Sequence, residues 1–175
     1  MRSPFFIFRA CPGARAVILE RRKTKDLSRL AVARFANRAQ RVAGVRGEVG
    51  ILLTGDEEIA SLNQQFRNKA KPTDVLSFPA LQAQAGAKQP TRLRVLGGDI
   101  AISLETARTQ AADYGHPLLT EVKVLILHGM LHLAGYDHES DNGRMERLER
   151  RLRAELHLPA GLIERNGNGI RKRRS

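Results

Sequence analysis

Residues 128–138 read HGMLHLAGYDH, and the rest of the chain is interpreted outward from this stretch. They end a strongly apolar segment that we expect to be helical. His128 and His132 are four residues apart, so on a helix their imidazoles leave the same face one turn apart. Gly135 permits the tight turn that ends a helix, and the chain can then bring His138 back to the first two histidines. The spacing therefore predicts three imidazoles gathered around one point.

Three imidazoles are a common ligand set for a first-row metal ion, and zinc is the first ion to consider. Three protein ligands leave a fourth position open, which is typical of catalytic rather than structural zinc sites. The single cysteine, Cys11, excludes both a Cys-based zinc site and an intramolecular disulfide. We therefore expect one Zn²⁺ per chain, held by His128, His132 and His138. The remaining two histidines, His116 and His157, have no such partners in the sequence.

The spacing of the three histidines and Gly135 matches the metzincin peptidase pattern HExxHxxGxxH. In those peptidases the Glu is the general base, whereas here Gly129 occupies its position and cannot do that work. Met145 follows His138 too closely for a Met-turn. Three functions remain open at this point: a metal-dependent hydrolase of RNA, a non-catalytic zinc protein that docks on RNA, and a metzincin-like zinc peptidase.

Apolar periodicity and turn residues predict the other elements of the fold. Helices are expected over about residues 26–43, 54–66, 103–114, 118–133 and 140–156, with Thr54, Ser103 and Ser140 as candidate caps. Strands are expected over about residues 16–19, 49–53, 75–79 and 100–102. The chain thus predicts an α/β (α+β-like) single domain, a small mixed sheet of about four strands packed with about five helices, one of them a zincin-like helix that carries the metal.

The last predicted helix has Met145, Leu148, Leu152 and Leu156 on one face. The pairs Glu146–Arg150 and Glu149–Arg153 are expected on its opposite, exposed face. We expect an N-terminal extension over residues 1–15, a metal-dependent domain over 16–160, and a basic, disordered tail over 161–175. A loop is expected over residues 80–93. No apolar run approaches the roughly 18 residues needed to cross a bilayer, so no membrane partner is expected.

The chain of 175 residues carries 30 basic and 18 acidic side chains, a formal net charge of +12. The excess is uneven, because residues 1–50 carry net +9 and residues 151–175 net +5, whereas residues 51–150 carry net −2. A basic excess favours a polyanion as partner. Aromatic residues make up only 5% of the chain, which argues against a stacking platform for single-stranded nucleic acid.

The sequence resembles the YbeY family of endoribonucleases over about residues 16–160. Residues 128–138 match that family's signature, a second block spans residues 62–67 with Lys69 and residues 72–79, and a third is Gly98-Asp99-Ile100. The resemblance implies a zinc-dependent, single-strand-specific endoribonuclease. The apolar run Phe5–Phe8 is too short for a secretory signal, so we expect a cytoplasmic protein. It implies a role in ribosomal RNA processing, notably 3′ end maturation of 16S rRNA, and in ribosome quality control. The implied partners are single-stranded or ribosomal RNA and the ribosome or its small subunit, with no small-molecule cofactor.

By position, the resemblance makes the three histidines the zinc ligands and Arg67 a functional residue beside the metal cleft. A planar, permanently charged guanidinium is suited to the negative charge that develops during phosphodiester cleavage. Lys69 and Lys71 flank Arg67 and are candidate phosphate contacts. Phe66 replaces a usual Tyr and Gly97 a usual Leu, the latter expected to loosen the start of its strand. The general base stays open, with Asp74, Asp99, Asp137 and Ser77 all left outside the catalytic set.

Overall fold

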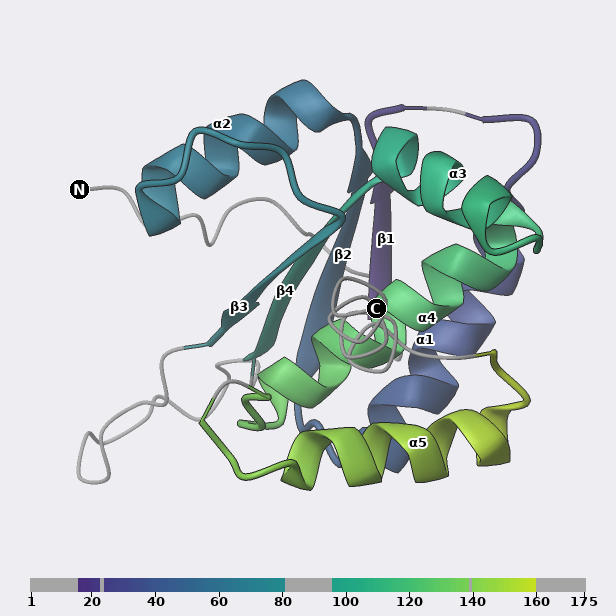
Figure 1. Ribbon diagram of the computed structural model, residues 1–175, viewed down its shortest axis with the longest axis vertical. Helices are drawn as coiled ribbons and strands as arrows, with labels where there is room; N and C mark the ends of the chain where they lie inside the picture. The colour runs from purple at the N-terminus through teal and green to yellow at the C-terminus, as the bar shows by residue number, and fades with distance from the viewer. Residues whose placement is uncertain (1–15, 23, 81–95, 139, 160–175) are drawn as a thin grey trace, which may run out of the picture.

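The computed structural model describes residues 16–22, 24–80, 96–138 and 140–159. Its centre is a sheet of four strands in the order β1-β2-β4-β3 (Figure 1). β1 (Ala16–Glu20), β2 (Glu48–Thr54) and β4 (Leu96–Ser103) run parallel, and β3 (Val75–Pro79) lies antiparallel to β4 at the edge. The predicted mixed sheet is therefore confirmed. The predicted segments 1–15 and 161–175, and the loop over 80–93 apart from Ala80, lie outside the described residues.

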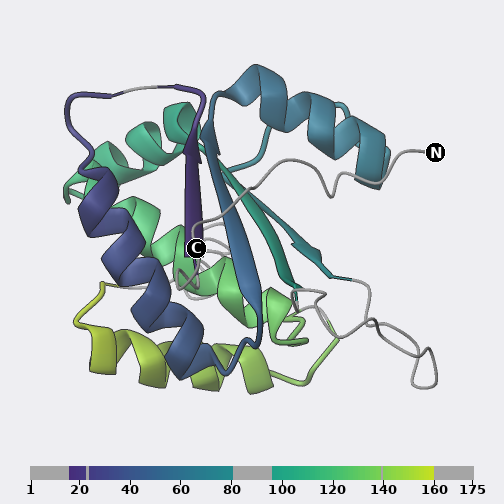
Figure 2. The same ribbon diagram turned by 180° about the vertical axis from the view of Figure 1, so that it is seen from behind.

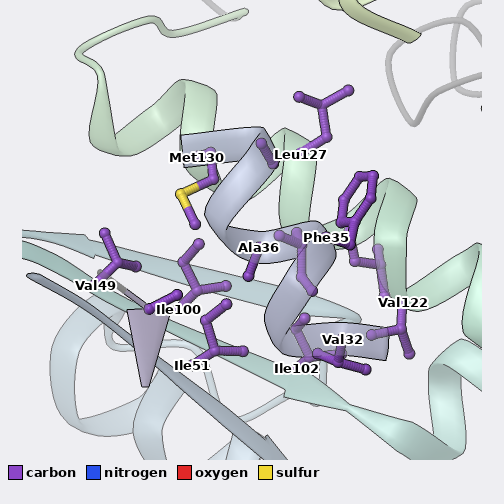
Figure 3. Packing of buried hydrophobic residues seen from close by; sticks show 14 of the residues in the cluster. Val32, Phe35, Ala36, Val49, Ile51, Ile100, Ile102, Val122, Leu127 and Met130 are labelled. Atoms are coloured by element: carbon purple, nitrogen blue, oxygen red, sulfur yellow. The ribbon is translucent and has the colours of Figure 1, made fainter. Parts of the chain in front are cut away.

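Successive side chains of the strands point to opposite faces of the sheet, and different helices cover the two faces. On one face Val49, Ile51 and Ile100 are fully buried and belong to the main core. Figure 3 shows these side chains pointing toward the helices that carry Val32 and Met130. Leu52 and Ala101 of the same strands face the other way into a smaller cluster, which Leu76 and Phe78 of β3 join.

Five helices surround the sheet, as predicted (Figures 1 and 2). On the side of the main core lie α1 (Arg29–Ala43), α3 (Leu104–Asp113), α4 (Leu118–Leu133) and α5 (Arg144–Leu156). The other face is covered by α2 (Asp56–Arg67), which buries Ile59 against it. No described helix has the length and apolarity needed to cross a membrane.

α4 is the most buried helix, because it lies between the sheet and three other helices. Ten of its sixteen residues are buried, from Glu121 to Leu131. The helix begins after Pro117, which fixes its own φ and suits a helix start. It ends where Gly135, at φ +89°, reverses the chain direction. The two histidines near its C-terminal end are thus carried by the best-packed element of the fold.

Of the predicted caps, Ser103 is confirmed, because its Oγ accepts a hydrogen bond from the Thr106 N–H at 3.2 Å. The predicted cap Thr54 is wrong. β2 extends through Thr54, whose hydroxyl donates to Glu58 Oε2 at 2.5 Å, and α2 begins two residues later, at Asp56. Its first N–H, on Asp56, is satisfied instead by Glu105 Oε2 of α3 at 2.8 Å.

The predicted cap Ser140 is also wrong. Its hydroxyl donates to Asp137 at 2.7 Å, and α5 begins at Arg144. The carboxylate of Asp141 accepts from the N–H groups of Arg144 and Met145 at 3.0 and 2.8 Å. The Asp141 carboxylate thus satisfies the unpaired N–H groups of the first turn, which the Ser140 hydroxyl was expected to satisfy. The helix therefore starts later than predicted.

Gly97 lies at an irregularity at the start of β4. The register of β2 and β4 shifts between Glu48 and Val49, whose partners are Leu96 and Gly98, so Gly97 is the extra residue of a bulge. A Cβ at position 97 would lie 2.8 Å from the carbonyl oxygen of Arg46. Glycine therefore permits a close approach of two backbones, and a leucine has no room here.

Candidate metal centre

The three predicted histidine ligands converge. α4 supplies His128 and His132, and the loop that follows it supplies His138. The Nε2 atoms of His128 and His132 lie 3.1 Å apart. One ring nitrogen from each of the three residues lies within 4.8 Å of the others. Among the described residues, this is the one group of three or more His, Cys, Asp or Glu side chains placed to hold a metal ion.

The return of His138 follows from the way α4 ends. The N–H of Gly135 donates to the carbonyl of His132 at 3.0 Å, and the N–H of Tyr136 donates to that of Leu131 at 3.1 Å. These bonds satisfy the last carbonyls of the helix while the positive φ of Gly135 turns the chain. As a result, the ring centroid of His138 lies 5.4 Å from the ring centroids of both His128 and His132.

A buried carboxylate orients the innermost ligand. Nδ1 of His128 lies 3.2 Å from Oε1 of Glu149 on α5, and only 1% of the Glu149 side chain is exposed. A carboxylate at this nitrogen holds the Nδ1–H tautomer, so the lone pair of Nε2 points toward the other histidines. Glu149 would therefore position His128 for a metal ion.

Glu149 is the site residue that sequence reasoning missed. It was expected on the exposed face with Arg153, but both are buried, whereas the Glu146–Arg150 pair is confirmed at 2.7 Å and exposed. A signal was present, since Glu149 follows Met145 by four residues and precedes Leu152 by three, on the apolar stripe. A charged residue on such a stripe indicates a buried partner.

The surroundings of His132 keep its imidazole neutral. Burial, and then the neighbouring His128 and His138, lower the pKa of His132 from 6.5 to about 4. Hydrogen bonding at Tyr136 and the charge of Asp137 oppose this shift but do not reverse it. Neutral imidazole is the form that binds a metal, so His132 is suited to act as a ligand at neutral pH.

The geometry fits a first-row metal ion. Nitrogen ligands at about 2.0–2.1 Å in a tetrahedron lie about 3.3 Å apart, close to the 3.1 Å between Nε2 of His128 and Nε2 of His132. His128 is buried, His132 is half-buried and His138 is exposed. The three ligands would therefore hold the ion from the protein side and leave its outer side accessible.

The structure explains why glycine follows the first ligand. A Cβ on Gly129 would lie 2.9 Å from Cδ1 of Ile100 and 3.1 Å from Oγ of Ser77. This position faces the sheet at close contact, so it has no room for the glutamate of the metzincin pattern. Ser77 is itself buried against α4, which is consistent with a structural role.

Arg67, Lys69 and Lys71 are carried by other elements than the histidines. Arg67 is the exposed last residue of α2, and the two lysines are exposed in the loop that follows. Asn63 holds this loop, since its Nδ2 donates to the carbonyl of Lys71 at 2.7 Å. Figure 1 shows α2 and α4 on opposite faces of the sheet. In the described part of the chain, no hydrogen bond or ion pair joins these three cations to the histidines.

The edge strand β3 nevertheless connects the two groups. The ring of Phe66, next to Arg67, packs edge-on against Phe78 of β3 with centroids 5.2 Å apart. On the opposite face of the same strand, Ser77 lies against Gly129 of α4. The end of α2 and the end of α4 thus flank one edge strand. Phe66 therefore makes this ring contact although it lacks the hydroxyl of the usual Tyr.

The remaining polar residues have local partners. Asp74 accepts from the N–H of Val75 at 2.8 Å and from Nε2 of Gln110 at 3.0 Å, which fixes the start of β3. Burial raises the pKa of Asp99, which is half-buried beside Phe78 on the α2 side of the sheet. His116 lies 3.0 Å from Glu121, and His157 ends α5 at φ 54°.

Comparison with known proteins agrees with this site. The family model described as endoribonuclease YbeY matches residues 15–157. A protein named endoribonuclease YbeY from Koribacter versatilis is 45% identical over 157 residues, covering 89% of this chain and 95% of the relative. Its counterpart from Solibacter usitatus is 48% identical over 145 residues, covering 83% and 90%.

A solution structure of a Thermotoga maritima protein aligns with a TM-score of 0.49 and 25% identity, covering 77% of this chain and 85% of that one. The match of the family model extends from the start of β1 to the end of α5 and includes all three histidines. The chain belongs to the endoribonuclease YbeY family.

Proposed function

We propose that this chain is a zinc-dependent, single-strand-specific endoribonuclease that acts in ribosomal RNA processing in the cytoplasm. Its reaction would include 3′ end maturation of 16S rRNA and would contribute to ribosome quality control. The observation that carries the proposal is the convergence of His128, His132 and His138, with His128 oriented by Glu149. Membership of the endoribonuclease YbeY family supports RNA as the substrate.

The chain's own residues supply ligands and positive charge. The three imidazoles would hold Zn²⁺, which when bound polarises a phosphoryl oxygen and lowers the pKa of water. Arg67 would stabilise the charge that develops on the phosphate, because a guanidinium forms strong, bidentate bonds to phosphate oxygens. Lys69 and Lys71, exposed beside it, would bind neighbouring phosphates.

A role in peptide cleavage fits the site less well. The peptidases with this histidine spacing use a glutamate beside the first ligand as general base. At that position Gly129 lies against Ile100 and leaves no room for a side chain. A purely structural metal also fits less well, because the exposed side of His138 leaves the centre open.

The proposal is tested by one cleavage assay paired with elemental analysis. Labelled single-stranded RNA is incubated with the wild type and with His132→Ala, each with and without a chelator. We expect cleavage by the untreated wild type alone, with about one zinc per chain in the wild type and much less in the variant. A double-stranded RNA of the same sequence serves as the control for strand specificity and should remain intact.

Two results would contradict the proposal. Equal cleavage in every tube would point to a contaminating nuclease and favour a zinc protein that only docks on the ribosome. Metal-dependent hydrolysis of casein, without cleavage of RNA, would favour a peptidase. Binding to the small ribosomal subunit is checked separately by co-sedimentation of the wild type with purified subunits.

A further inference from the structure

A basic groove lies beside the metal centre. It is a cleft of about 480 Å³ between α5 and the loop that follows α4, and its lining consists of Tyr136, Arg144, Arg147, Leu148 and Arg151. Three of these five residues are arginines, and the lining contributed by described residues includes no carboxylate. We call these five residues the arginine groove.

The groove is built on one ridge of α5. Residues 144, 147, 148 and 151 recur at the spacing that places side chains on one helix face. Met145 and Leu152 lie on another face of α5 and are buried in the core. Their packing fixes the orientation of the helix, so that the groove residues face outward. The groove arginines are exposed, whereas Leu148 is half-buried and forms part of the apolar floor.

The arrangement of like charges on this ridge is unfavourable for the helix itself. Arg147 has Arg144 three residues before it and Arg151 four residues after it, and like charges at these spacings destabilise a helix. Cations in the first turns also oppose the helix dipole. Among the described residues no carboxylate pairs with these three arginines, although Arg150 on the neighbouring face pairs with Glu146 at 2.7 Å.

The groove adjoins the three histidines in two ways. Tyr136, which lines it, precedes the ligand His138 by two residues in the same loop. Glu149, on the same helix as the arginines, orients the ligand His128. Figures 1 and 2 show α5 starting beside the C-terminal end of α4, the helix that carries His128 and His132.

We propose that the arginine groove binds the phosphodiester backbone of the RNA strand on one side of the bond that is cleaved. This inference rests on the proposed function and adds a path for the substrate. Guanidinium groups match phosphate oxygens in charge and geometry. Residues 144 to 151 span about 10 Å of helix axis, and Tyr136 and Leu148 offer an apolar surface to a ribose or base. An anionic strand relieves the repulsion among the three arginines.

The test compares two triple variants with the same change in charge. The groove variant carries Arg144→Gln, Arg147→Gln and Arg151→Gln. The control variant replaces three exposed cations outside the groove, in the loop before α1, on α1 and on α3: Lys25→Gln, Arg34→Gln and Arg108→Gln. Circular dichroism verifies that both variants fold as the wild type does. A third variant with lysine at the groove positions retains the charge.

Binding of a short, unstructured RNA is measured by fluorescence anisotropy over a range of salt, with chelator present to prevent cleavage. A slope of about −0.7 per phosphate contact in log K against log salt is expected for single strands. The groove variant should therefore lose about two units of slope and at least about tenfold in affinity, while the control changes little. The lysine variant should keep most of the slope. In the cleavage assay, the KM of the groove variant should be higher than that of the wild type, with little change in kcat.

The outcomes separate the groove from the proposed function. If the wild type cleaves RNA and the groove variant behaves like the control, the groove inference is wrong and the function stands. If the wild type neither binds nor cleaves RNA, the proposed function fails and the groove inference fails with it. If the groove variant loses binding to poly-glutamate but not to RNA, the groove is a docking site for acidic protein and the inference is overturned.

Discussion

Glu149 shows how one buried side chain connects two helices to the metal centre. It lies on α5, contacts His128 on α4, and is shielded from solvent. A carboxylate at Nδ1 raises the basicity of the ligand and fixes its tautomer. The effect on the metal should therefore be large even though Glu149 does not touch it.

Replacing Glu149 with alanine should weaken zinc binding about 10- to 100-fold. The affinity is measured by competition with a chromophoric chelator at neutral pH. Glu149→Gln retains an oxygen that can accept from Nδ1–H and should lose less. The matched control is Glu146→Ala, which removes an exposed carboxylate from the same helix. Equal zinc affinity for Glu149→Ala and the wild type would refute the positioning role.

Arg67 should affect cleavage without affecting the metal. Arg67→Ala removes a charge proposed to act on the phosphate, so kcat for single-stranded RNA should fall about 10²- to 10³-fold. Zinc content should stay near one per chain, because Arg67 makes no described contact with the histidines. Arg67→Lys keeps the positive charge but loses the planar guanidinium, so its kcat should lie between those of Arg67→Ala and the wild type. Unchanged cleavage by purified Arg67→Ala would remove this residue from the mechanism.

Gly129 should tolerate no side chain. Gly129→Ala places a Cβ 2.9 Å from Cδ1 of Ile100 and should destabilise the fold by about 1–3 kcal/mol in urea unfolding. Ile100→Val removes that Cδ1, so the double variant should lose less stability than the sum of the two single variants. If the losses in unfolding free energy of the two single variants simply add up in the double variant, the contact with Ile100 is not what excludes a side chain at position 129.

The residues of the site differ in how far sequence predicts them. His128, His132 and His138 are predictable because helical spacing and one turn suffice to bring them together. Glu149 comes from a helix about twenty residues away, and only packing reveals its contact with His128. The position of Arg67 across β3 depends on the order of strands in the sheet, which local patterns do not encode.

At the scale of elements, α2 depends on α3 for its start. The hydroxyl of Ser103 donates to the Asp56 carboxylate, and that of Thr106 donates to Oδ1 of Asp56 at 2.7 Å. The hydrogen bond from Ser103, assisted by those from Thr106 and the charge of Arg22, lowers the pKa of Asp56 against the opposing effect of burial. The ionised form is therefore favoured in the folded state.

This lowered pKa predicts the pH dependence of an Asp56→Asn variant. The ionised carboxylate stabilises the fold fully above its unfolded pKa of 3.8, and that contribution is lost as the pH falls through the lower folded value. The difference in unfolding free energy between wild type and variant should be largest near neutral pH and shrink below about pH 3.8. Glu57→Gln, exposed in the same turn, is the control. A difference that stays constant down to pH 2 would contradict the prediction.

The elements themselves are largely predictable, but their starts are not. α4 runs from Leu118 to Leu133 as expected, because Pro117 and Gly135 are local signals. The starts of α2 and α5 differ because Glu105 and Asp141 satisfy their first N–H groups. Such carboxylate acceptors compete with the nearest hydroxyl, and one of them comes from a different element.

At the scale of the whole molecule, the basic excess lies toward the two ends of the sequence, whereas the arginine groove is a local cluster of cations. Deleting residues 166–175 removes Arg171, Lys172, Arg173 and Arg174. RNA binding should weaken and its salt slope flatten by up to about three units, because four fewer phosphates can be neutralised. Cleavage of a short substrate should persist. A full-length chain with glutamine at these four positions separates charge from length, and loss of cleavage in both would contradict the prediction.

The close contact of Gly129 with the sheet has a consequence for heat inactivation. Two of the three ligands sit on a helix that cannot shift without breaking the main core, since position 129 touches Ile100 and Ser77. In many enzymes the reactive centre is on loops that melt first, and activity disappears before the body unfolds. Here His128 and His132 share the cooperative unit of the core, so we expect both to keep their places on warming until the domain melts, whereas His138 lies on the exposed loop that follows.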